Sequence, residues 1–368
     1  MHRARRVIAH EADVAVVGLG AMGSCAAWRL AKRGARVVGF DRFRPPHAAG
    51  SSHGGSRIIR ELAFEGPHFV PLVRRAFTLW DELIAESRSS ALLLRTGIVY
   101  LGSPESSVVA QSLKSGAAHD VATEFLDSDQ VASRWPAFRL GAGMVGLYEK
   151  RAGVLRPESC IAAALRRAEH YGAELHLDEP VLEWGARAGM AWVRTARRRL
   201  EAGTIVLAMG PWLLDDLKAL GIEAWVERVV QHYFEPAGTA EALGPERLPP
   251  YICEDESGVI FYGFPLLDGV VKCAIHHRGE STTIEALDRS VAPEEVDRAR
   301  SYLERFLPAA AGRHHHSAVC VYTNTPDGKF HVARHPSHRE VIVASPCSGI
   351  GFKFAPAIGD TIADLAGI

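Results

Sequence analysis

The sequence lacks the long apolar run that a membrane-spanning helix needs, which is about 20 consecutive apolar residues. Its first residues are basic, but they are not followed by the apolar stretch of a secretory signal peptide. We therefore expect neither membrane insertion nor secretion, and the cytoplasm is the default location.

The sequence also lacks an excess of charge of one sign. Lys plus Arg number 42 and Asp plus Glu number 43, which gives a formal net charge of −1. Proteins that grip nucleic acids or anionic membranes rely on a surplus of basic side chains, so neither is an expected partner. Apolar residues make up 47% and charged residues 23%, which is ordinary globular composition and excludes a disordered chain.

Cysteine is sparse and scattered. The six cysteines form no C-x-x-C pair and show no zinc-like spacing, so neither a disulfide framework nor a structural zinc site is expected. A short histidine run at residues 314–316 has no converging ligands in the sequence, and we expect no metal there.

A dinucleotide-binding pattern stands near the start of the chain. A buried strand is predicted at residues 13–17, a helix at 21–32 and a second strand at 35–40, with the glycine motif GLGAMG between the first two. An acidic residue follows the second strand. This order of strand, glycine motif, helix, strand and acid is the dinucleotide fingerprint.

Each residue of the fingerprint has a physical role. Gly18 permits the tight turn, Gly20 lets a pyrophosphate approach the backbone, and Gly23 lets the helix pack closely on the strand. Asp41 is expected to accept hydrogen bonds from ribose hydroxyls and to disfavour a 2′-phosphate. The motif alone does not separate FAD from NAD.

The order of predicted elements gives the fold class. Strands alternate with helices at both ends of the chain, and the middle is rich in strands, so we expect an α/β fold with a Rossmann-like domain interrupted by a sheet-rich, α+β substrate domain. Residues 1–90, 152–222 and 318–368 are assigned to the nucleotide-binding domain, and residues 91–151 and 223–317 to the substrate domain.

Longer motifs in the chain resemble one family. They are GSSHGGSRIIRE (residues 50–61), GVLRPESC (153–160), LAMGPW (207–212), AVCVYTNTPDGKF (318–330) and SGIGFKF (348–354). Together and in this order they resemble the flavin-dependent amine oxidases typified by monomeric sarcosine oxidase and N-methyltryptophan oxidase. The resemblance implies FAD, bound through a cysteine thioether, with Val181 at its adenosine end.

The resemblance places Cys320 at the flavin-linking position. A thiolate that attacks needs an electropositive setting, and the resemblance places His53 and Arg57 around the flavin, where they would supply positive charge. Taken alone, Cys320 would more often be a buried small apolar residue. Cys347, in PCSGIG, is a competitor for the same role.

Lys272 lies in an apolar strand, VVKCAI, where its charge is costly unless it is used. The resemblance makes it the residue that faces the flavin and promotes reaction with O2, although a lysine that reaches solvent from a strand edge is the alternative. His276 is four residues further on and therefore on the same face of a strand. The resemblance places it beside Tyr262 in the substrate pocket.

Arg60 and Lys353 look like a clamp for the carboxylate of an amino acid, and the alternative for each is a structural salt bridge. A guanidinium binds a carboxylate through two hydrogen bonds, and an ammonium adds a second positive charge. Gly349 and Gly351 precede Lys353 near the start of the last helix, where backbone N–H groups would stabilise negative charge on the flavin.

The predicted pocket departs from sarcosine oxidase. Ile350 stands where the family has histidine, Ala63 replaces tyrosine, Cys253 replaces methionine, and Glu61 stands where those enzymes have histidine. The family residues that remain are Tyr262, Tyr322, Glu65, His276, Arg60 and Lys353. We expect a roomier and more apolar pocket than sarcosine requires.

These residues together predict an amine oxidase. The substrate is expected to be an N-methyl or cyclic secondary amino acid, oxidised to an imine that hydrolyses, with O2 reduced to hydrogen peroxide. The alternatives are a flavin dehydrogenase that passes electrons to a carrier and a non-catalytic dinucleotide-binding subunit.

Overall fold

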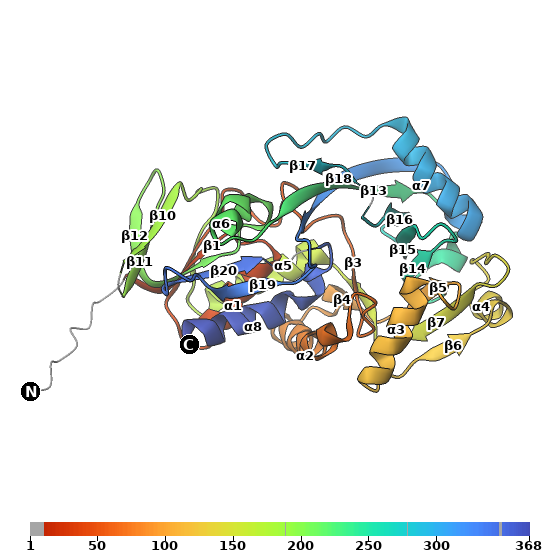
Figure 1. The fold of residues 1–368 in the computed structure, drawn as a ribbon, viewed down its shortest axis with the longest axis horizontal. Coiled ribbons are helices and arrows are strands. Elements are labelled where there is room, and N and C mark those ends of the chain that lie inside the picture. Colours follow the sequence, from red (N-terminus) through yellow and green to blue (C-terminus); the bar gives the residue numbers. More distant parts are fainter. Residues whose placement is uncertain (1–10, 188, 278, 346–347) are drawn as a thin grey trace, which may run out of the picture.

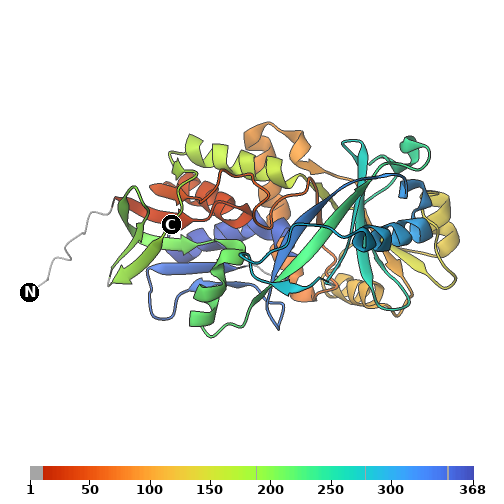
Figure 2. The same ribbon diagram turned by 90° about the horizontal axis from the view of Figure 1, so that it is seen from above.

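A computed structural model of the protein describes residues 11–187, 189–277, 279–345 and 348–368. The described residues form two lobes that lie side by side, each built around one large β-sheet (Figure 1). One sheet has eight strands and the other has nine within the described ranges, and a small three-stranded sheet accompanies them. Strands β13 and β18 run from the middle of the molecule into the second lobe (Figure 2).

The eight-stranded sheet forms the core of the first lobe. Its central strand is apolar except for Asp13 and pairs in parallel with a strand on either side, as expected for a sheet buried on both faces. The spatial order is β10 (Glu183–Arg187), β11 (Met190–Arg194), β12 (Arg199–Leu207), β1 (Ala12–Val17), β2 (Val37–Phe40) and β9 (Glu174–His176); β20 (Val341–Ser345) also pairs with β12, and β19 (His331–Arg334) with β20.

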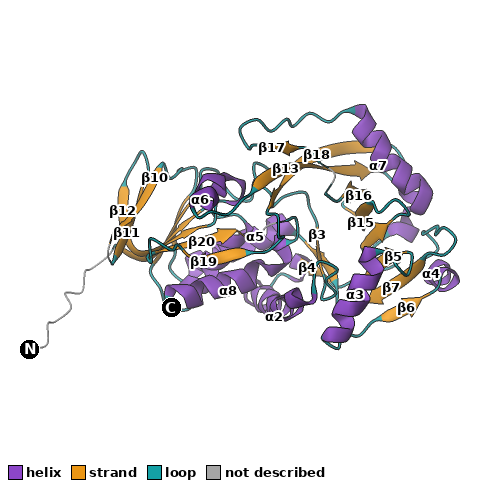
Figure 3. Ribbon diagram, viewed as in Figure 1, coloured by secondary structure: helices purple, strands orange, loops and turns teal. Residues whose placement is uncertain are grey.

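Helices cover this sheet (Figure 3). The apolar side chains of the first helix are buried against two others that come from the middle and the end of the chain. These helices are α1 (Ala21–Lys32), α5 (Pro157–His170), α8 (Ala355–Ala366), α2 (Val70–Ser87) and the short α6 (Leu214–Ala219). The helix predicted at residues 21–32 is confirmed, and the second strand begins at Val37 rather than at residue 35.

The nine-stranded sheet forms the second lobe and is mostly antiparallel. Its order is β17 (Ser281–Thr282), β13 (Trp225–Phe234), β16 (Val270–Ile275), β15 (Ile260–Leu267), β14 (Tyr251–Glu254), β5 (Ile98–Gly102), β7 (Val145–Glu149) and β6 (Glu124–Leu126), with β18 (His314–Asn324) also paired to β13. The helices of this lobe are α3 (Ser107–Ala118), α4 (Ser128–Arg134) and α7 (Pro293–Phe306).

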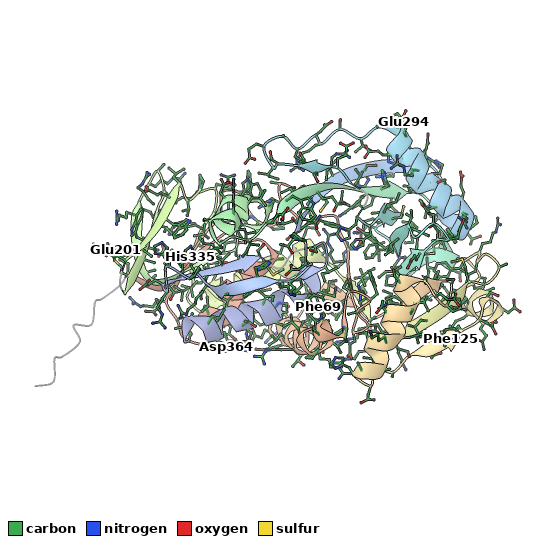
Figure 4. All side chains as sticks on the ribbon, in the orientation of Figure 1. Phe69, Phe125, Glu201, Glu294, His335 and Asp364 are labelled. Atoms are coloured by element: carbon green, nitrogen blue, oxygen red, sulfur yellow. The ribbon has the colours of Figure 1, made fainter. Side chains whose placement is uncertain are left out.

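A three-stranded sheet of β3 (Arg57–Ile59), β8 (Gly153–Leu155) and β4 (Leu93–Leu94) completes the described strands. Aromatic packing joins the last helix to the start of α2: the ring of Phe69, labelled near the middle of Figure 4, lies 5.0 Å from that of Phe330 and 5.6 Å from that of Phe354. Within the described residues, no helix combines the length and the apolar character that a membrane crossing requires.

The predicted fold class is confirmed, because a doubly wound α/β unit is interrupted by a strand-rich one. The predicted domain boundary at residue 318 falls inside β18. All of β18 pairs with β13 in the nine-stranded sheet. If each strand is assigned to the domain of its sheet, the boundary lies after Asn324 and not at residue 318. We propose that the two domains follow the two large sheets.

Candidate active site

A long cavity of about 340 Å³ opens beside the carboxyl ends of β1 and β2. This is the edge at which open parallel sheets bind their ligands. Of the residues predicted to hold the cofactor, six line this cavity: Gly18, Gly20, Asp41, Val181, Gly349 and Gly351.

The glycine motif has the geometry that its spacing predicts. Gly18 has a φ of +86°, and a Cβ atom there would lie 2.6 Å from the carbonyl oxygen of Ala208. A Cβ atom on Gly23 would lie 1.7 Å from the carbonyl oxygen of Gly18, so only glycine lets α1 approach the strand turn. At Gly20 the nearest atom to such a Cβ is Ser52 Oγ at 3.9 Å, which leaves open space beside the backbone.

Asp41 ends β2 and is buried against the motif. One carboxylate oxygen accepts the Leu19 N–H at 2.7 Å and the other accepts the Phe43 N–H at 2.9 Å. Each oxygen retains a second lone pair for a ligand hydroxyl. The carboxylate therefore fixes the turn and also faces the cavity.

Arg57 lines this cavity, and its guanidinium contacts Cys320. Cys320 is buried on β18, and its Sγ lies 3.6 Å from Arg57 Nη2 and 3.5 Å from the Ser51 carbonyl oxygen. The same Nη2 donates to that carbonyl at 2.8 Å. A guanidinium beside a sulfur is the electropositive setting that stabilises a thiolate.

A second cavity of about 90 Å³ adjoins the first. The two share Arg57, Tyr322, Gly349 and Phe352 in their walls. Every residue predicted to bind substrate lines the second cavity: Arg60, Glu65, Tyr322, Ile350 and Lys353. Of the residues predicted to be catalytic, Tyr262 and His276 line it together with Arg57.

The register of the nine-stranded sheet explains why distant residues share this cavity. Ile252 pairs with Tyr262, Tyr262 pairs with Ala274, and Ala274 pairs with Gln231, so these four stand in one row across four strands. Side chains in such a row point to the same face of the sheet. That face looks into the cavity, since three of the four line it.

Arg60 is buried and its charge is compensated. Its guanidinium donates to the Leu62 carbonyl and to Glu65 Oε1, and it lies 4.7 Å from the centre of the Phe64 ring. Burial opposes ionisation of Glu65, but the charges of Arg60 and then Lys353 hold the pKa of this carboxyl below its usual range. The second oxygen of Glu65 is buried and has no hydrogen-bond partner among the described residues.

Lys353 lies in the short helical turn Gly351–Phe354 and is also buried. Its Nζ donates to the Ile350 carbonyl at 3.3 Å, and its own carbonyl accepts the Trp80 indole N–H at 2.9 Å. Burial and the Arg60 charge lower the pKa of Lys353 to about 7. An anion bound between Arg60 and Lys353 would oppose both effects.

Three aromatic side chains form a polar edge of the cavity. The Tyr322 hydroxyl lies 3.4 Å from the Tyr262 hydroxyl and 3.4 Å from His276 Nδ1, which are long, weak hydrogen bonds. Burial and the neighbouring His277 lower the pKa of His276 to about 3, so the imidazole is neutral at physiological pH.

Residues 13–365 of the chain match the family described as FAD dependent oxidoreductase. The chain belongs to this family. It is 42% identical to monomeric sarcosine oxidase from Streptomyces avermitilis, over 96% of this chain and 93% of that protein. It is 33% identical to N-methyl-L-tryptophan oxidase from Salmonella arizonae, over 96% of this chain and 94% of that protein.

Solved structures share the fold of this FAD dependent oxidoreductase at low sequence identity. NikD, an amino acid oxidase essential for nikkomycin biosynthesis, superposes with a TM-score of 0.84 at 23% identity and covers 96% of this chain and 93% of its own. The L-proline dehydrogenase from P. horikoshii gives 0.83 at 20% identity, with 97% and 94% covered.

The long cavity of this family member fits FAD. It is bounded by the glycine motif, an acidic strand end and the backbone of residues 348–351, as a dinucleotide with a flavin ring requires. Ser348 Oγ lines the cavity, is buried, and has no partner among the described residues, so a polar ligand atom would satisfy it. The resemblance to FAD enzymes is thereby supported by the shape and chemistry of the cavity.

Lys272 is buried on β16 and lines neither cavity. Its Nζ donates to the Gly54 carbonyl at 3.0 Å and to the Ser56 carbonyl at 2.6 Å, and it lies 4.2 Å from the centre of the Phe264 ring. Burial and the Arg57 charge lower its pKa well below the usual value. Its hydrogen bonds place Lys272 against the loop that leads into Arg57.

The structure does not support the expectation that His53 supplies positive charge. Burial and the nearby Arg57 lower the pKa of His53 to about 4, so its ring is neutral at physiological pH. His53 is buried, lines neither cavity, and its Nε2 has no partner among the described residues. Cys347 lies outside the described residues.

The expectation of a roomier pocket is not supported by three of the four substitutions named for it. Cys253 is buried on the opposite face of β14 from Ile252, within the apolar core under α7, and does not line the cavity. Ala63 packs into the core of the first lobe. Glu61 binds Arg74 and Arg151 and also lies outside the cavity. Only Ile350 changes the cavity wall.

Several lining residues were missed in the sequence. Gln231 lines the second cavity from β13, and its Oε1 accepts the Tyr233 hydroxyl at 3.1 Å. The strand VERVVQHYF contains several polar residues, so Gln231 gave no distinct signal in the sequence. The apolar wall, formed by Ile58, Phe64, Ile252, Ile260, Phe264 and Phe352, gave none, because such residues usually form core.

Proposed function

We propose that the protein oxidises a small secondary amino acid, N-methyl or cyclic, to an imine and passes the electrons to O2 with release of hydrogen peroxide. The observation that carries this proposal is the small cavity that adjoins the FAD cavity and holds two buried cations, Arg60 and Lys353. Relatives named sarcosine oxidase and N-methyl-L-tryptophan oxidase support the same substrate class.

FAD, when bound, supplies the two-electron acceptor for the carbon next to the amine. The residues of the chain bind and orient the substrate. Arg60 and Lys353 would hold its carboxylate, and the apolar wall would exclude water from the reacting carbon. The polar edge formed by Tyr262, Tyr322 and His276 would contact the amine.

The charges of the cavity favour a neutral amine. Arg60 is a buried cation, Arg57 is a half-buried one, and Lys353 adds a third positive charge below its pKa of about 7. Like charges around the substrate position disfavour an ammonium group. Only Glu65 opposes them, and one of its oxygens is bound to Arg60. Because a protonated nitrogen has no lone pair to donate to the forming imine, the rate of the reductive step should rise with pH as the bound amine loses its proton.

We further propose that the FAD is attached covalently through Cys320. The pairing of its sulfur with Arg57 and its place beside the loop that lines the cavity support this role. The four other described cysteines, Cys25, Cys160, Cys253 and Cys273, are buried, and burial raises the pKa of each thiol, which makes them poor nucleophiles.

Lys272 is proposed to promote the reaction with O2. A positive charge close to the redox centre would stabilise the superoxide that forms when the first electron is transferred. Its hydrogen bonds to the loop before Arg57 and its contact with Phe264, which lines the second cavity, support this proposal.

One experiment tests the proposed function. The purified holoenzyme is mixed anaerobically with sarcosine, N-methyl aromatic amino acids and pipecolate, and the absorbance of the flavin is followed. Bleaching by a secondary amino acid, followed in air by oxygen uptake with equal peroxide release, is the expected result. Bleaching without reaction with O2 would instead indicate a dehydrogenase, and no bleaching by any amine a non-catalytic subunit.

A further inference from the structure

Glu149 is a buried carboxylate that lies outside both cavities and contacts the segment after Arg60. It ends β7, and its side chain is completely inaccessible to solvent. Oε1 accepts the Glu61 N–H at 2.6 Å and Oε2 accepts the Leu62 N–H at 3.0 Å. The two oxygens thus bind two consecutive backbone groups of this segment.

Tyr100, on the neighbouring strand β5, completes the contact. Its hydroxyl lies 3.2 Å from Glu149 Oε2 and 3.2 Å from the carbonyl oxygen of Leu62. That carbonyl also accepts a hydrogen bond from the Arg60 guanidinium, whose centre lies 5.8 Å from the centre of the Tyr100 ring. Glu149 therefore holds Leu62 through its N–H, while the carbonyl of the same residue binds Arg60. The Tyr100 hydroxyl has one proton, which it donates either to Glu149 Oε2 or to that carbonyl.

The chemistry of Glu149 is specific to a carboxylate. Among the described residues, no Lys, Arg or His forms an ion pair with it, and a buried carboxylate without such a partner is costly. Two backbone N–H groups bind two different oxygens, so an amide in the same place would direct its NH2 group at one of these donors. A glutamine could satisfy one of the two, but not both.

We propose that Glu149 is a positioning residue that holds Arg60 in the geometry that binds the substrate's carboxylate. It acts through the backbone of Glu61 and Leu62 and through the hydroxyl of Tyr100. This inference rests on the proposed function, in which Arg60 and Lys353 bind the acid group of the substrate.

The test measures the binding of methoxyacetate, an acid with the shape of sarcosine but with an ether in place of the amine, by titration calorimetry on the holoenzyme. Methoxyacetamide, which lacks the charge, is measured beside it. In Glu149→Gln the affinity for methoxyacetate should fall about 10- to 100-fold, as for a displaced binding group, and that for methoxyacetamide should stay unchanged. KM for the amino acid substrate should rise more than kcat falls.

Glu61→Gln is the matched control. Glu61 is a buried carboxylate of the same segment, but its side chain binds Arg74 and Arg151 and does not contact Arg60. This variant should lower the unfolding temperature and keep the affinity for the acid. If Glu149→Gln fails to fold, Tyr100→Phe removes only the hydroxyl and should weaken acid binding in the same direction.

Arg60→Gln separates the two ways in which the inference could fail. If Arg60→Gln loses the acid while Glu149→Gln and Tyr100→Phe both keep it, the positioning role is wrong and the proposed function stands. If Arg60→Gln also keeps the acid, the carboxylate clamp and the positioning role are both wrong. The inference further requires that the double variant Arg60→Gln with Glu149→Gln binds no more weakly than Arg60→Gln alone.

Discussion

Arg57 Nη2 lies 3.6 Å from the sulfur of Cys320, although the two residues belong to different sheets. Arg57 opens β3 in the small sheet, and Cys320 lies in the middle of β18 in the nine-stranded sheet. Because Arg57 also lines both cavities, this pair marks the place where the FAD cavity, the substrate cavity and the proposed attachment site meet.

Replacement of Cys320 tests the covalent attachment. In Cys320→Ala we expect the yellow colour to remain in the supernatant after acid precipitation, whereas in the parent protein it should stay with the pellet. Cys273→Ala is the matched control, since Cys273 is buried on β16, which pairs with β13 as β18 does, and faces the apolar core. Colour that stays with the pellet of Cys320→Ala would transfer the role to another residue, and Cys347 is the first to replace.

The pKa of Lys353 predicts how acid binding depends on pH. With a pKa of about 7 in the free site, Lys353 is charged below pH 7 and loses its charge above it. The affinity for methoxyacetate should therefore fall as pH rises from about 6 to about 9, with uptake of a proton on binding near neutrality. Arg60, whose pKa is raised, and Glu65, whose pKa is lowered, keep their charges through this range.

Lys353→Met separates this effect from that of Glu149, whose pKa burial raises to about 7 and which gains negative charge over the same range. The variant should bind methoxyacetate weakly at pH 6 and lose most of the pH dependence. A pH dependence that survives unchanged in Lys353→Met would assign the titration to Glu149 instead.

Replacement of Lys272 should affect one half of the reaction. We expect Lys272→Met to slow the reoxidation of reduced flavin by O2 about 10²- to 10³-fold, the size of effect found when one preorganised electrostatic contact is removed, and to leave anaerobic reduction by substrate nearly unchanged. Stopped-flow absorbance measures both rates. Lys329→Met, at an exposed lysine, is the control; equal slowing of both half-reactions by Lys272→Met would indicate a structural role.

The glycine motif allows a test that separates folding from FAD binding. In Gly23→Ala the new Cβ would meet the Gly18 carbonyl oxygen at 1.7 Å, so we expect the apoprotein to lose about 1–3 kcal/mol of stability or more. In Gly20→Ala the methyl group has space within the protein, so the apoprotein should keep its stability and bind FAD more weakly. Thermal unfolding of both apoproteins and FAD titration would show whether the two effects separate.

Ile350 is the substitution in the cavity wall that bears on substrate choice. Replacement by histidine, the residue that sarcosine oxidases have there, should raise kcat/KM for sarcosine relative to an N-methyl amino acid with an apolar side chain. A change of the ratio by about 10-fold corresponds to the contribution of one or two methylene groups in an apolar pocket. An unchanged ratio would mean that Ile350 does not decide specificity.

The sequence by itself determined the nucleotide-binding unit. The spacing of Gly18, Gly20 and Gly23, the apolar strand before them and Asp41 after the second strand are properties of contiguous residues, and local geometry leaves them one arrangement. The helix at residues 21–32 follows in the same way from local apolar spacing.

Only the tertiary structure decided the charges and walls of the site. Arg60, Tyr262 and Lys353 come from three distant segments, and their contacts depend on the register of the nine-stranded sheet and on how the two lobes pack. The neutral state of His53 and the exclusion of Cys253 from the cavity could not be read from the sequence. The pKa of a group and its place in or outside a cavity wall both depend on which groups the fold brings within a few ångströms, and that is a property of the packed chain.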